Sequence, residues 1–266
     1  MREIPILLYH NIGNYPENMM EDGMLPETFA KQMKFLADNG YQIVTLSQAL
    51  DYMSRRTKLS SKAMAITIDG GYQDAFTNVF PVLKKYDFPA TFFVPPESIG
   101  KERTIGGESI KCMSWEEVHE IRNSGMDIGL LAYQGRSIRL NNYNEHAIKE
   151  SIAPAMKILG REINPQVRYC AFKEGVPEKS LWHFLKQQGF GAVFTQCPTN
   201  RRAAVDGIGR IQVDDDDHNI FLTKISRTYL FFKDRRSWKY VRKYKLDKVV
   251  HWLSETSDSI KEKWQR

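Results

Sequence analysis

Short apolar runs alternate with longer segments of mixed polarity along most of this chain. The run ILLY at residues 6–9 has no polar interruption, which is typical of a parallel strand buried on both faces. The segments between such runs carry helix signals. Pro26 opens one helix and Gly40 ends it, and Ser114 with Glu117 forms a capping box for another. The pattern predicts strands over residues 4–9, 41–46, 64–68, 90–94, 126–131, 167–172, 190–195 and 210–213.

The regular alternation of strand and helix predicts a parallel sheet, either open and doubly wound or closed into a barrel. Seven or eight strands in 266 residues, with no G-x-G-x-x-G after the first strand, favour the barrel. We therefore predict an α/β fold, a distorted (β/α)7 or (β/α)8 barrel, over residues 1–232. Further helices are expected near residues 143–159 and 178–188, and Pro81 and Pro154 are expected to kink or break their helices.

The composition is that of a globular protein, with 42% hydrophobic and 12% aromatic residues. The first thirteen residues contain an apolar run too short for a secretory signal and far short of the ~20 residues of a membrane span. The three cysteines, Cys112, Cys170 and Cys197, lie far apart and suit a reducing compartment. These features predict a cytoplasmic protein. An exported mature form whose signal has been removed is the alternative.

Positive charge is concentrated near the C-terminus. The chain has a formal net charge of +6, and residues 233–248 alone carry eight basic residues against two acidic ones. We expect residues 233–266 to form a basic helical appendage. Residues 233–248 could contact an anionic glycan, a membrane surface or a nucleic acid, and the alternative is a solvated helix face. No feature predicts a specific nucleic-acid partner, and the oligomeric state is not predicted.

The most specific pattern is AITIDGGYQDAFTNVFPVLKKYDFPATFFV at residues 65–94. It resembles the first motif region of the NodB-type polysaccharide deacetylases, carbohydrate esterase family four, which read T-F-D-D-G-Y, then P-x-L-K-K-Y, then A-T-F-F-V. Other segments resemble the family in the same order: LLYH at 7–10, SWEEVHEIRNSGMDIG at 114–129 and GFGAVFT at 189–195. The resemblance covers roughly residues 4–213 and implies a barrel that acts on polysaccharides.

The resemblance also implies a metal site, which this sequence does not preserve. Family members hold a divalent metal, usually zinc, with one Asp and two His, and a neighbouring Asp is the general base. The base aligns with Asp69, whereas the three ligand positions align with Gly70, Leu131 and Gly135. Since zinc needs about three protein ligands, we expect no metal and no other cofactor.

Three residues are candidates for catalysis. Asp69 is either a surviving catalytic carboxylate or a cap for the turn that follows it. Lys173 and Glu174 stand where the family carries a Pro-Tyr pair. They could form an ion pair that fills the former metal site, or they could point into solvent.

Other residues near the predicted strand ends are candidates for sugar binding. His10 follows the first strand and could bind a sugar or a metal, or be a hydrogen-bonded structural histidine. The residues after the strand predicted over residues 126–131 could contact a sugar or form an ordinary exposed loop. The full set of candidate substrate-binding residues is His10, Tyr72, Tyr133, Gln134, Arg136 and Arg210.

Together these features predict a polysaccharide deacetylase-like protein of cell-surface polysaccharide biosynthesis. It would bind carbohydrate, with the metal-dependent deacetylase site lost. The alternative is an active hydrolase that deacetylates an O-antigen-like or exopolysaccharide sugar through a rebuilt, metal-independent site, cleaving carbon–nitrogen bonds or acetyl esters. A third interpretation is an interaction protein that acts through its basic tail.

Overall fold

The computed structural model of the chain describes residues 3–15, 23–105, 108–132, 145–163, 167–172, 179–196, 207–214 and 218–226. The chain divides into two compact units, Met1–Asp214 and Asp215–Arg266. The described part of the second unit contains helix α8 (His218–Ile225). The predicted boundary at residue 232 and the basic appendage lie outside the described residues and stay predictions.

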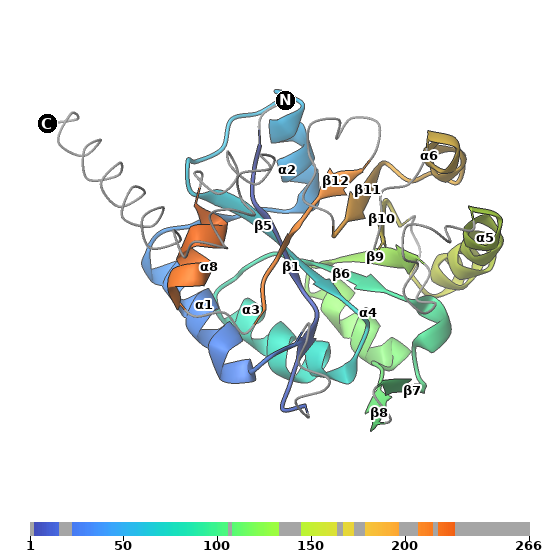
Figure 1. Ribbon diagram of the computed structural model, residues 1–266, viewed down its shortest axis with the longest axis horizontal. Coiled ribbons are helices and arrows are strands. Elements are labelled where there is room, and N and C mark those ends of the chain that lie inside the picture. Colours follow the sequence, from blue (N-terminus) through green and yellow to red (C-terminus); the bar gives the residue numbers. More distant parts are fainter. Residues whose placement is uncertain are drawn as a thin grey trace, which may run out of the picture. The chain divides into compact units, whose positions relative to one another are not determined.

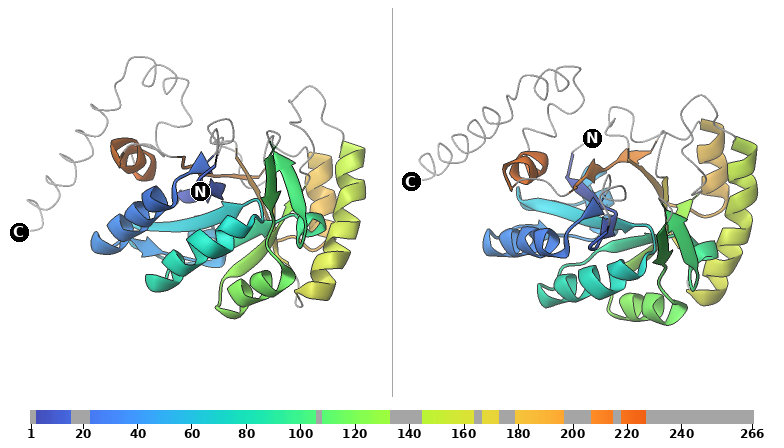
Figure 2. Two further views of the ribbon diagram at one scale, coloured as in Figure 1. Left: turned by 90° about the horizontal axis from the view of Figure 1, so that it is seen from below. Right: turned by 60° about the horizontal axis from the view of Figure 1, so that its bottom comes forward.

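The first unit is built on a ring of parallel strands with helices outside it (Figures 1 and 2). Neighbouring strands follow the order β12-β11-β10-β9-β6-β5-β1-β13, and every pair in this order is parallel. The prediction of a distorted (β/α)7 or (β/α)8 barrel is confirmed. The strands are β1 (Ile6–Tyr9), β5 (Ala63–Asp69), β6 (Thr91–Val94), β9 (Asp127–Ala132), β10 (Tyr169–Phe172), β11 (Ala192–Thr195), β12 (Ile208–Gly209) and β13 (Ile211–Gln212).

One short segment closes the ring. Its first half, β12, pairs with β11 through Ile208, and its second half, β13, pairs with β1 through Ile211. Between the two halves, the Arg210 N–H donates to the Thr195 carbonyl at 3.0 Å. Strands β11 and β1 thus pair with neighbouring parts of one continuous segment. Arg210 lies between these parts, at the point where the barrel closes.

The apolar core fills the barrel interior with side chains of alternating residues from its strands. Ala63 and Ala65 of β5, Tyr169 and Ala171 of β10, and Ala192 and Phe194 of β11 belong to one buried cluster. This period of two is the alternation expected of a strand whose successive side chains face opposite sides. The same alternation directs Thr67 and Asp69 of β5 toward the interior.

Local sequence signals explain most helix ends. Pro26 occupies the first turn of α1, and Gly40, with a φ of +67°, follows its end. The predicted capping box of Ser114 and Glu117 starts α4. The helices are α1 (Pro26–Asp38), α2 (Leu46–Met53), the π-helix η2 (Ala75–Val79), α3 (Phe80–Lys85), the 3-10 helix η3 (Pro96–Ser98), α4 (Trp115–Asn123), α5 (Glu145–Glu162) and α6 (Lys179–Gln187).

Some local predictions were wrong in extent. The strand expected over residues 41–46 is only β4 (Gln42–Ile43), because a capping box of Thr45 and Gln48 starts α2 at Leu46. Pro154 does not break its helix, since α5 continues through it to Glu162, whereas Pro81 lies in the first turn of α3, where η2 ends.

Two small two-stranded sheets supplement the barrel. β2 (Asn11–Ile12) pairs with β3 (Gly23–Met24), and β7 (Glu102–Ile105) forms an antiparallel hairpin with β8 (Glu108–Lys111). No helix in the described ranges has the length and hydrophobicity that crossing a bilayer requires.

Candidate functional site

The polar centre of the barrel is an ion pair between Asp69 and Arg210. Asp69 is the last residue of β5, and Arg210 lies in the closing segment. The guanidinium donates from Nη1 to Oδ1 at 2.6 Å and from Nη2 to Oδ2 at 2.7 Å. The Arg210 side chain is 0% exposed and the Asp69 side chain 1%. This two-point contact is the geometry in which arginine binds a carboxylate most strongly.

Neighbouring side chains fix the guanidinium in place. Arg210 Nη1 also lies 3.3 Å from the Thr67 hydroxyl, which itself donates to the Leu7 carbonyl at 2.7 Å. The Phe93 ring lies under the guanidinium, 5.2 Å from its carbon to the ring centroid. Arg210 Nε is buried without a hydrogen-bond partner among the described residues. Both carboxylate oxygens therefore accept a hydrogen bond from the guanidinium, whereas its Nε has no acceptor in the described part of the chain.

The first of the family's metal-ligand positions does not suit a ligand here. Gly70 follows Asp69 directly and has a φ of +124°, a conformation that residues with a side chain rarely adopt. A Cβ placed on Gly70 would lie 2.5 Å from the Tyr72 ring. The backbone at Gly70 thus has no room for the Asp that the family uses.

The second position is occupied by core packing. Leu131, near the end of β9, is 2% exposed and belongs to the interior cluster. Phe93 fills the neighbouring space, because a Cβ on Gly129 would lie 2.4 Å from its ring. The third position, Gly135, lies outside the described residues. In the described ranges, no group of three or more His, Cys, Asp or Glu side chains could hold a metal. Among the described residues, the two positions that align with the family's zinc ligands therefore do not fit that metal.

Other predicted site residues lie in different surroundings. His10 is buried directly after β1. Tyr72 is also buried, and its hydroxyl accepts from Arg103 Nη1 at 3.2 Å, so the ring faces the β7–β8 hairpin. The remaining candidates, Tyr133, Gln134, Arg136, Lys173 and Glu174, lie outside the described residues, and their roles stay predictions.

The cysteine near the pair is not a nucleophile. Cys170 lies on β10 and is completely buried. Burial raises the pKa of the Cys170 thiol, and the nearby Arg210 charge lowers it only in part. Since the thiolate is the reactive form, Cys170 packs as a small apolar side chain.

The sequence did not predict that two of its candidate residues, Asp69 and Arg210, contact each other. It proposed Asp69 and Arg210 separately, although they lie 141 residues apart and form one pair. It did not select Thr67 and Phe93, which complete the surroundings of Arg210. The period-two alternation of β5 was the available signal for Thr67, because it places residues 67 and 69 on one face.

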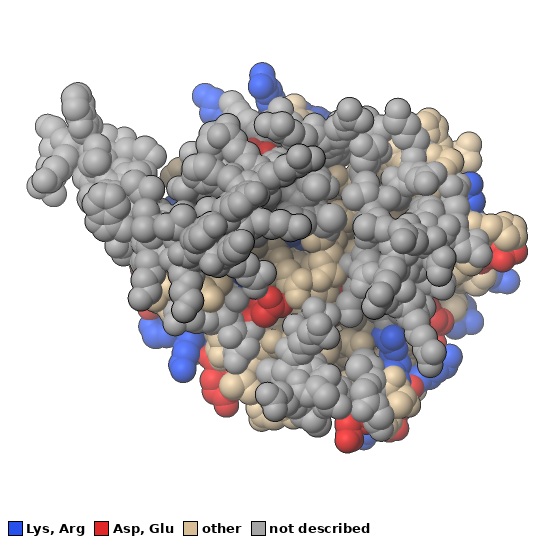
Figure 3. Space-filling model, viewed as in Figure 1, with Lys and Arg blue, Asp and Glu red and all other residues tan. Residues whose placement is uncertain are grey.

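The face of the molecule seen in Figure 3 carries charges of both signs. Lys and Arg side chains and Asp and Glu side chains of the described residues are both visible around its edge, and nearer the middle acidic side chains lie beside uncharged ones. The charged side chains visible there do not form a patch of one sign.

Comparison with known proteins identifies the family. The sequence profile of the family described as "Polysaccharide deacetylase" matches residues 56–193. YxkH of Bacillus subtilis, a protein assigned to the polysaccharide deacetylases, is 38% identical over 213 residues, which cover 79% of this chain and 71% of that protein. The poly-beta-1,6-N-acetyl-D-glucosamine N-deacetylase of Staphylococcus aureus is 23% identical over 198 residues, which cover 71% of this chain and 67% of that enzyme.

Solved structures share the same fold. IcaB from Ammonifex degensii superposes with a TM-score of 0.66 at 27% identity, covering 79% of this chain and 91% of that one. The Streptococcus pyogenes deacetylase PplD, solved with acetate, has a TM-score of 0.69 at 18% identity, covering 84% of this chain and 98% of that one. By the profile match, the relationship to YxkH and the shared barrel, this chain belongs to the polysaccharide deacetylase family.

Proposed function

We propose that this protein binds an N-acetylated polysaccharide and does not hydrolyse it by the family's metal-dependent route. The observation that carries the proposal is the substitution of the ligand positions inside an intact barrel. Gly70 has a backbone conformation unsuited to an Asp, and Leu131 packs in the core. The choice of substrate class rests on the family and on relatives named as deacetylases of poly-beta-1,6-N-acetyl-D-glucosamine.

Asp69 and Arg210 have a positioning role in this proposal. Their pairing ties the end of β5 to the segment that closes the barrel, so it fixes the shape of the mouth. Breaking a buried pair of this kind leaves an uncompensated charge. Direct contact of either group with a sugar stays a prediction, as do the cytoplasmic location and the role of residues 233–248 in binding anionic surfaces.

A second candidate function is hydrolysis without a metal. The retained Asp69 carboxylate, held by the Arg210 guanidinium, is the observation that favours it. In this alternative, Lys173 and Glu174 would complete a rebuilt site that removes acetyl groups from an O-antigen-like or exopolysaccharide sugar.

Parallel assays of binding and turnover separate these functions. The full chain is incubated with an N-acetylglucosamine oligosaccharide, with and without added zinc, while binding and acetate release are measured. We expect binding without acetate release in both conditions. Release that requires zinc would overturn the proposal. Zinc-independent release that is lost in Asp69→Asn would establish the second candidate, and failure to bind any N-acetylated glycan would contradict the carbohydrate-binding role.

A further inference from the structure

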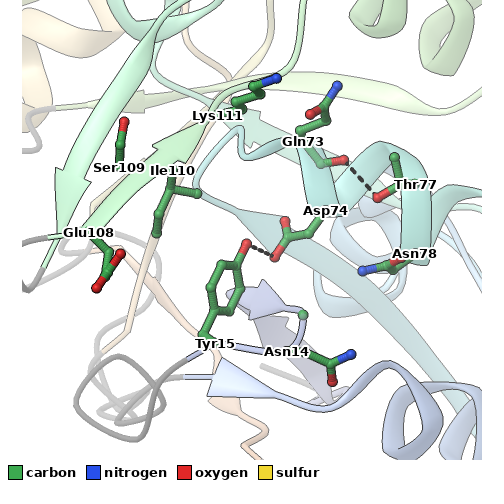
Figure 4. A pocket seen from close by; sticks show the side chains of 11 residues that line it. Asn14, Tyr15, Gln73, Asp74, Thr77, Asn78, Glu108, Ser109, Ile110 and Lys111 are labelled. Atoms are coloured by element: carbon green, nitrogen blue, oxygen red, sulfur yellow. Dashed lines mark hydrogen bonds between the residues drawn. The ribbon is translucent and has the colours of Figure 1, made fainter.

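A second polar site lies on the outside of the barrel, away from the Asp69–Arg210 pair. It is a cavity of about 480 Å³ between the segment that follows β2, the start of η2 and the β8 strand of the hairpin. Figure 4 shows Tyr15, Asp74 and Lys111 contributing to it from these three elements. Its volume lies within the range typical of small-ligand sites. Sugar-sized ligands therefore fit it.

The most unusual residue of this cavity is Asp74. Its side chain is buried, with the residue 8% exposed. Oδ2 accepts two hydrogen bonds, from the Ile12 N–H at 2.7 Å and from the Tyr15 hydroxyl at 2.8 Å. Oδ1 has no hydrogen-bond partner in the described part of the chain. A buried carboxylate oxygen without a donor is unfavourable, so this atom is suited to receive one from a ligand.

The surrounding backbone holds Asp74 in this position. Asn78 Nδ2 donates to the Ile12 carbonyl at 2.7 Å, so both polar groups of the Ile12 backbone are tied to the helical segment that follows β5. Tyr15 reaches Asp74 because Gly13 leaves room for its ring. A Cβ on Gly13 would lie 2.8 Å from that ring. η2 begins directly after Asp74 as a π-helix, an irregularity that is frequent at functional sites.

A purely structural role does not explain the carboxylate. The hydrogen bonds from Ile12 and Tyr15 both go to one carboxylate oxygen, Oδ2. The amide oxygen of an asparagine could accept the same two bonds without burying a charge. No described Lys, Arg or His forms an ion pair with Asp74. Buried charges are normally paired or neutralised. A ligand that brings a positive charge and an N–H donor to Oδ1 would satisfy both requirements.

The charges around the cavity agree with a cationic ligand. The cavity is lined by two carboxylates, those of Asp74 and Glu108, and by one ammonium group, that of Lys111. The amide and hydroxyl groups of Gln73, Thr77 and Ser109 also line the cavity and are suited to sugar hydroxyls. An acidic sugar such as a uronate would place a second negative charge near Asp74, which is unfavourable.

We propose that this cavity binds a free-amino hexosamine unit, with the sugar ammonium donating to Asp74 Oδ1. This inference rests on the proposed function for one point, which is that the ligand belongs to a glycan built of amino sugars. It adds a site that distinguishes the deacetylated unit from the N-acetylated one, because an acetamido group carries no positive charge.

The test uses the full chain and two small probes, methyl glucosaminide and methyl N-acetylglucosaminide. We expect the amino sugar to bind at least about tenfold more tightly, the factor expected for a hydrogen bond between charged groups. Asp74→Asn keeps an acceptor for Ile12 and Tyr15 and replaces Oδ1 with a donor. It should weaken amino-sugar binding by about 10- to 100-fold. Asp38→Asn makes the same charge change on the exposed face of α1 and should leave binding unchanged.

Two further variants keep the test valid if Asp74→Asn does not fold. Lys111→Gln removes the competing cation and should tighten amino-sugar binding about two- to threefold, whereas Glu108→Gln should weaken it by a similar factor. Equal affinity for the two probes, or the same affinity in Asp74→Asn as in the parent, would overturn the proposal. Failure of the proposed function is distinguishable, since that would appear as loss of N-acetylated polysaccharide binding while Asp74-dependent binding of methyl glucosaminide persists.

Discussion

Asp69 and Asp74 are buried carboxylates that lie five residues apart in the sequence, yet their surroundings differ in kind. Asp69 faces the barrel interior, and a guanidinium engages both of its oxygens. Asp74 faces the outside of the barrel, and neutral donors engage only one of its oxygens. The first carboxylate is satisfied within the fold and supports structure. The second keeps an acceptor that a ligand can use, so burial alone does not distinguish a structural carboxylate from a binding one.

The largest effect should come from removing the guanidinium of the interior pair. Arg210→Met leaves the Asp69 carboxylate buried without a partner, and we expect it to lower the free energy of unfolding by about 3–5 kcal/mol. Urea denaturation followed by circular dichroism measures this. The matched control is the double variant Arg210→Met with Asp69→Asn, which buries no charge and should lose less than the single Arg210 variant. A double variant at least as unstable as the single one would show that the pair is not a coupled unit.

A smaller loss is expected at the former ligand position. Gly70→Asp places a side chain at a φ of +124° and against the Tyr72 ring, so we expect the unfolding free energy to fall by about 1–3 kcal/mol. Combining it with Tyr72→Ala removes the steric contact and leaves only the backbone strain. If Gly70→Asp alone is as stable as the parent, the conformation at residue 70 is not the obstacle to a metal ligand.

The Asp69–Arg210 pair and the barrel around it show which features the sequence could predict and which it could not. The barrel, most of its strands and the helix signals at Pro26 and Ser114 follow from local patterns and short motifs, and the structure confirms them. The pairing of Asp69 with Arg210 depends on how the ring closes, because residue 210 lies between β12, which pairs with β11, and β13, which pairs with β1. No local pattern encodes that contact.

The outer cavity was equally inaccessible to sequence reasoning. It combines residues from three separate elements, among them the hairpin at residues 102–111, which has no apolar run that would identify it as strands. The sequence aligns Gly70 and Leu131 with metal-ligand positions of the family through the flanking motifs, and this assignment stays a prediction. The steric reason that no side chain fits at residue 70 required the Tyr72 ring position.

In the outer cavity, removing the hydrogen bond between Tyr15 and Asp74 should lower the stability of the protein only modestly. Tyr15→Phe removes the donor to Asp74 Oδ2 and leaves the Ile12 N–H bond, so we expect a loss of about 1 kcal/mol in the free energy of unfolding. Thermal unfolding of the variant and the parent at one pH measures it. Because the carboxylate remains, amino-sugar binding should be retained, and its loss would indicate that Tyr15 contacts the ligand directly.

The smallest effect should appear in the pH dependence of stability. Burial raises the pKa of Asp74 above its ordinary value of 3.8, and hydrogen bonds from Tyr15 and the backbone oppose this only in part. A carboxyl whose pKa is raised on folding stabilises the protein when it is protonated, and this contribution is lost as the pH rises through the raised value. The parent should therefore lose stability relative to Asp74→Asn as the pH rises from the ordinary pKa of 3.8 through the raised pKa of Asp74. A gain over that interval would mean that the folded protein stabilises the charged carboxylate and lowers the pKa of Asp74.

The central claim is that the family's metal site is absent from an otherwise intact barrel. Elemental analysis of the full chain, purified without chelators and dialysed after exposure to zinc, tests this most directly. The proposal predicts that zinc stays far below one ion per chain, because Gly70 and Leu131 provide no ligand atoms at two of the three family positions. A tightly held metal at roughly one per chain would contradict it and would point to a rebuilt centre.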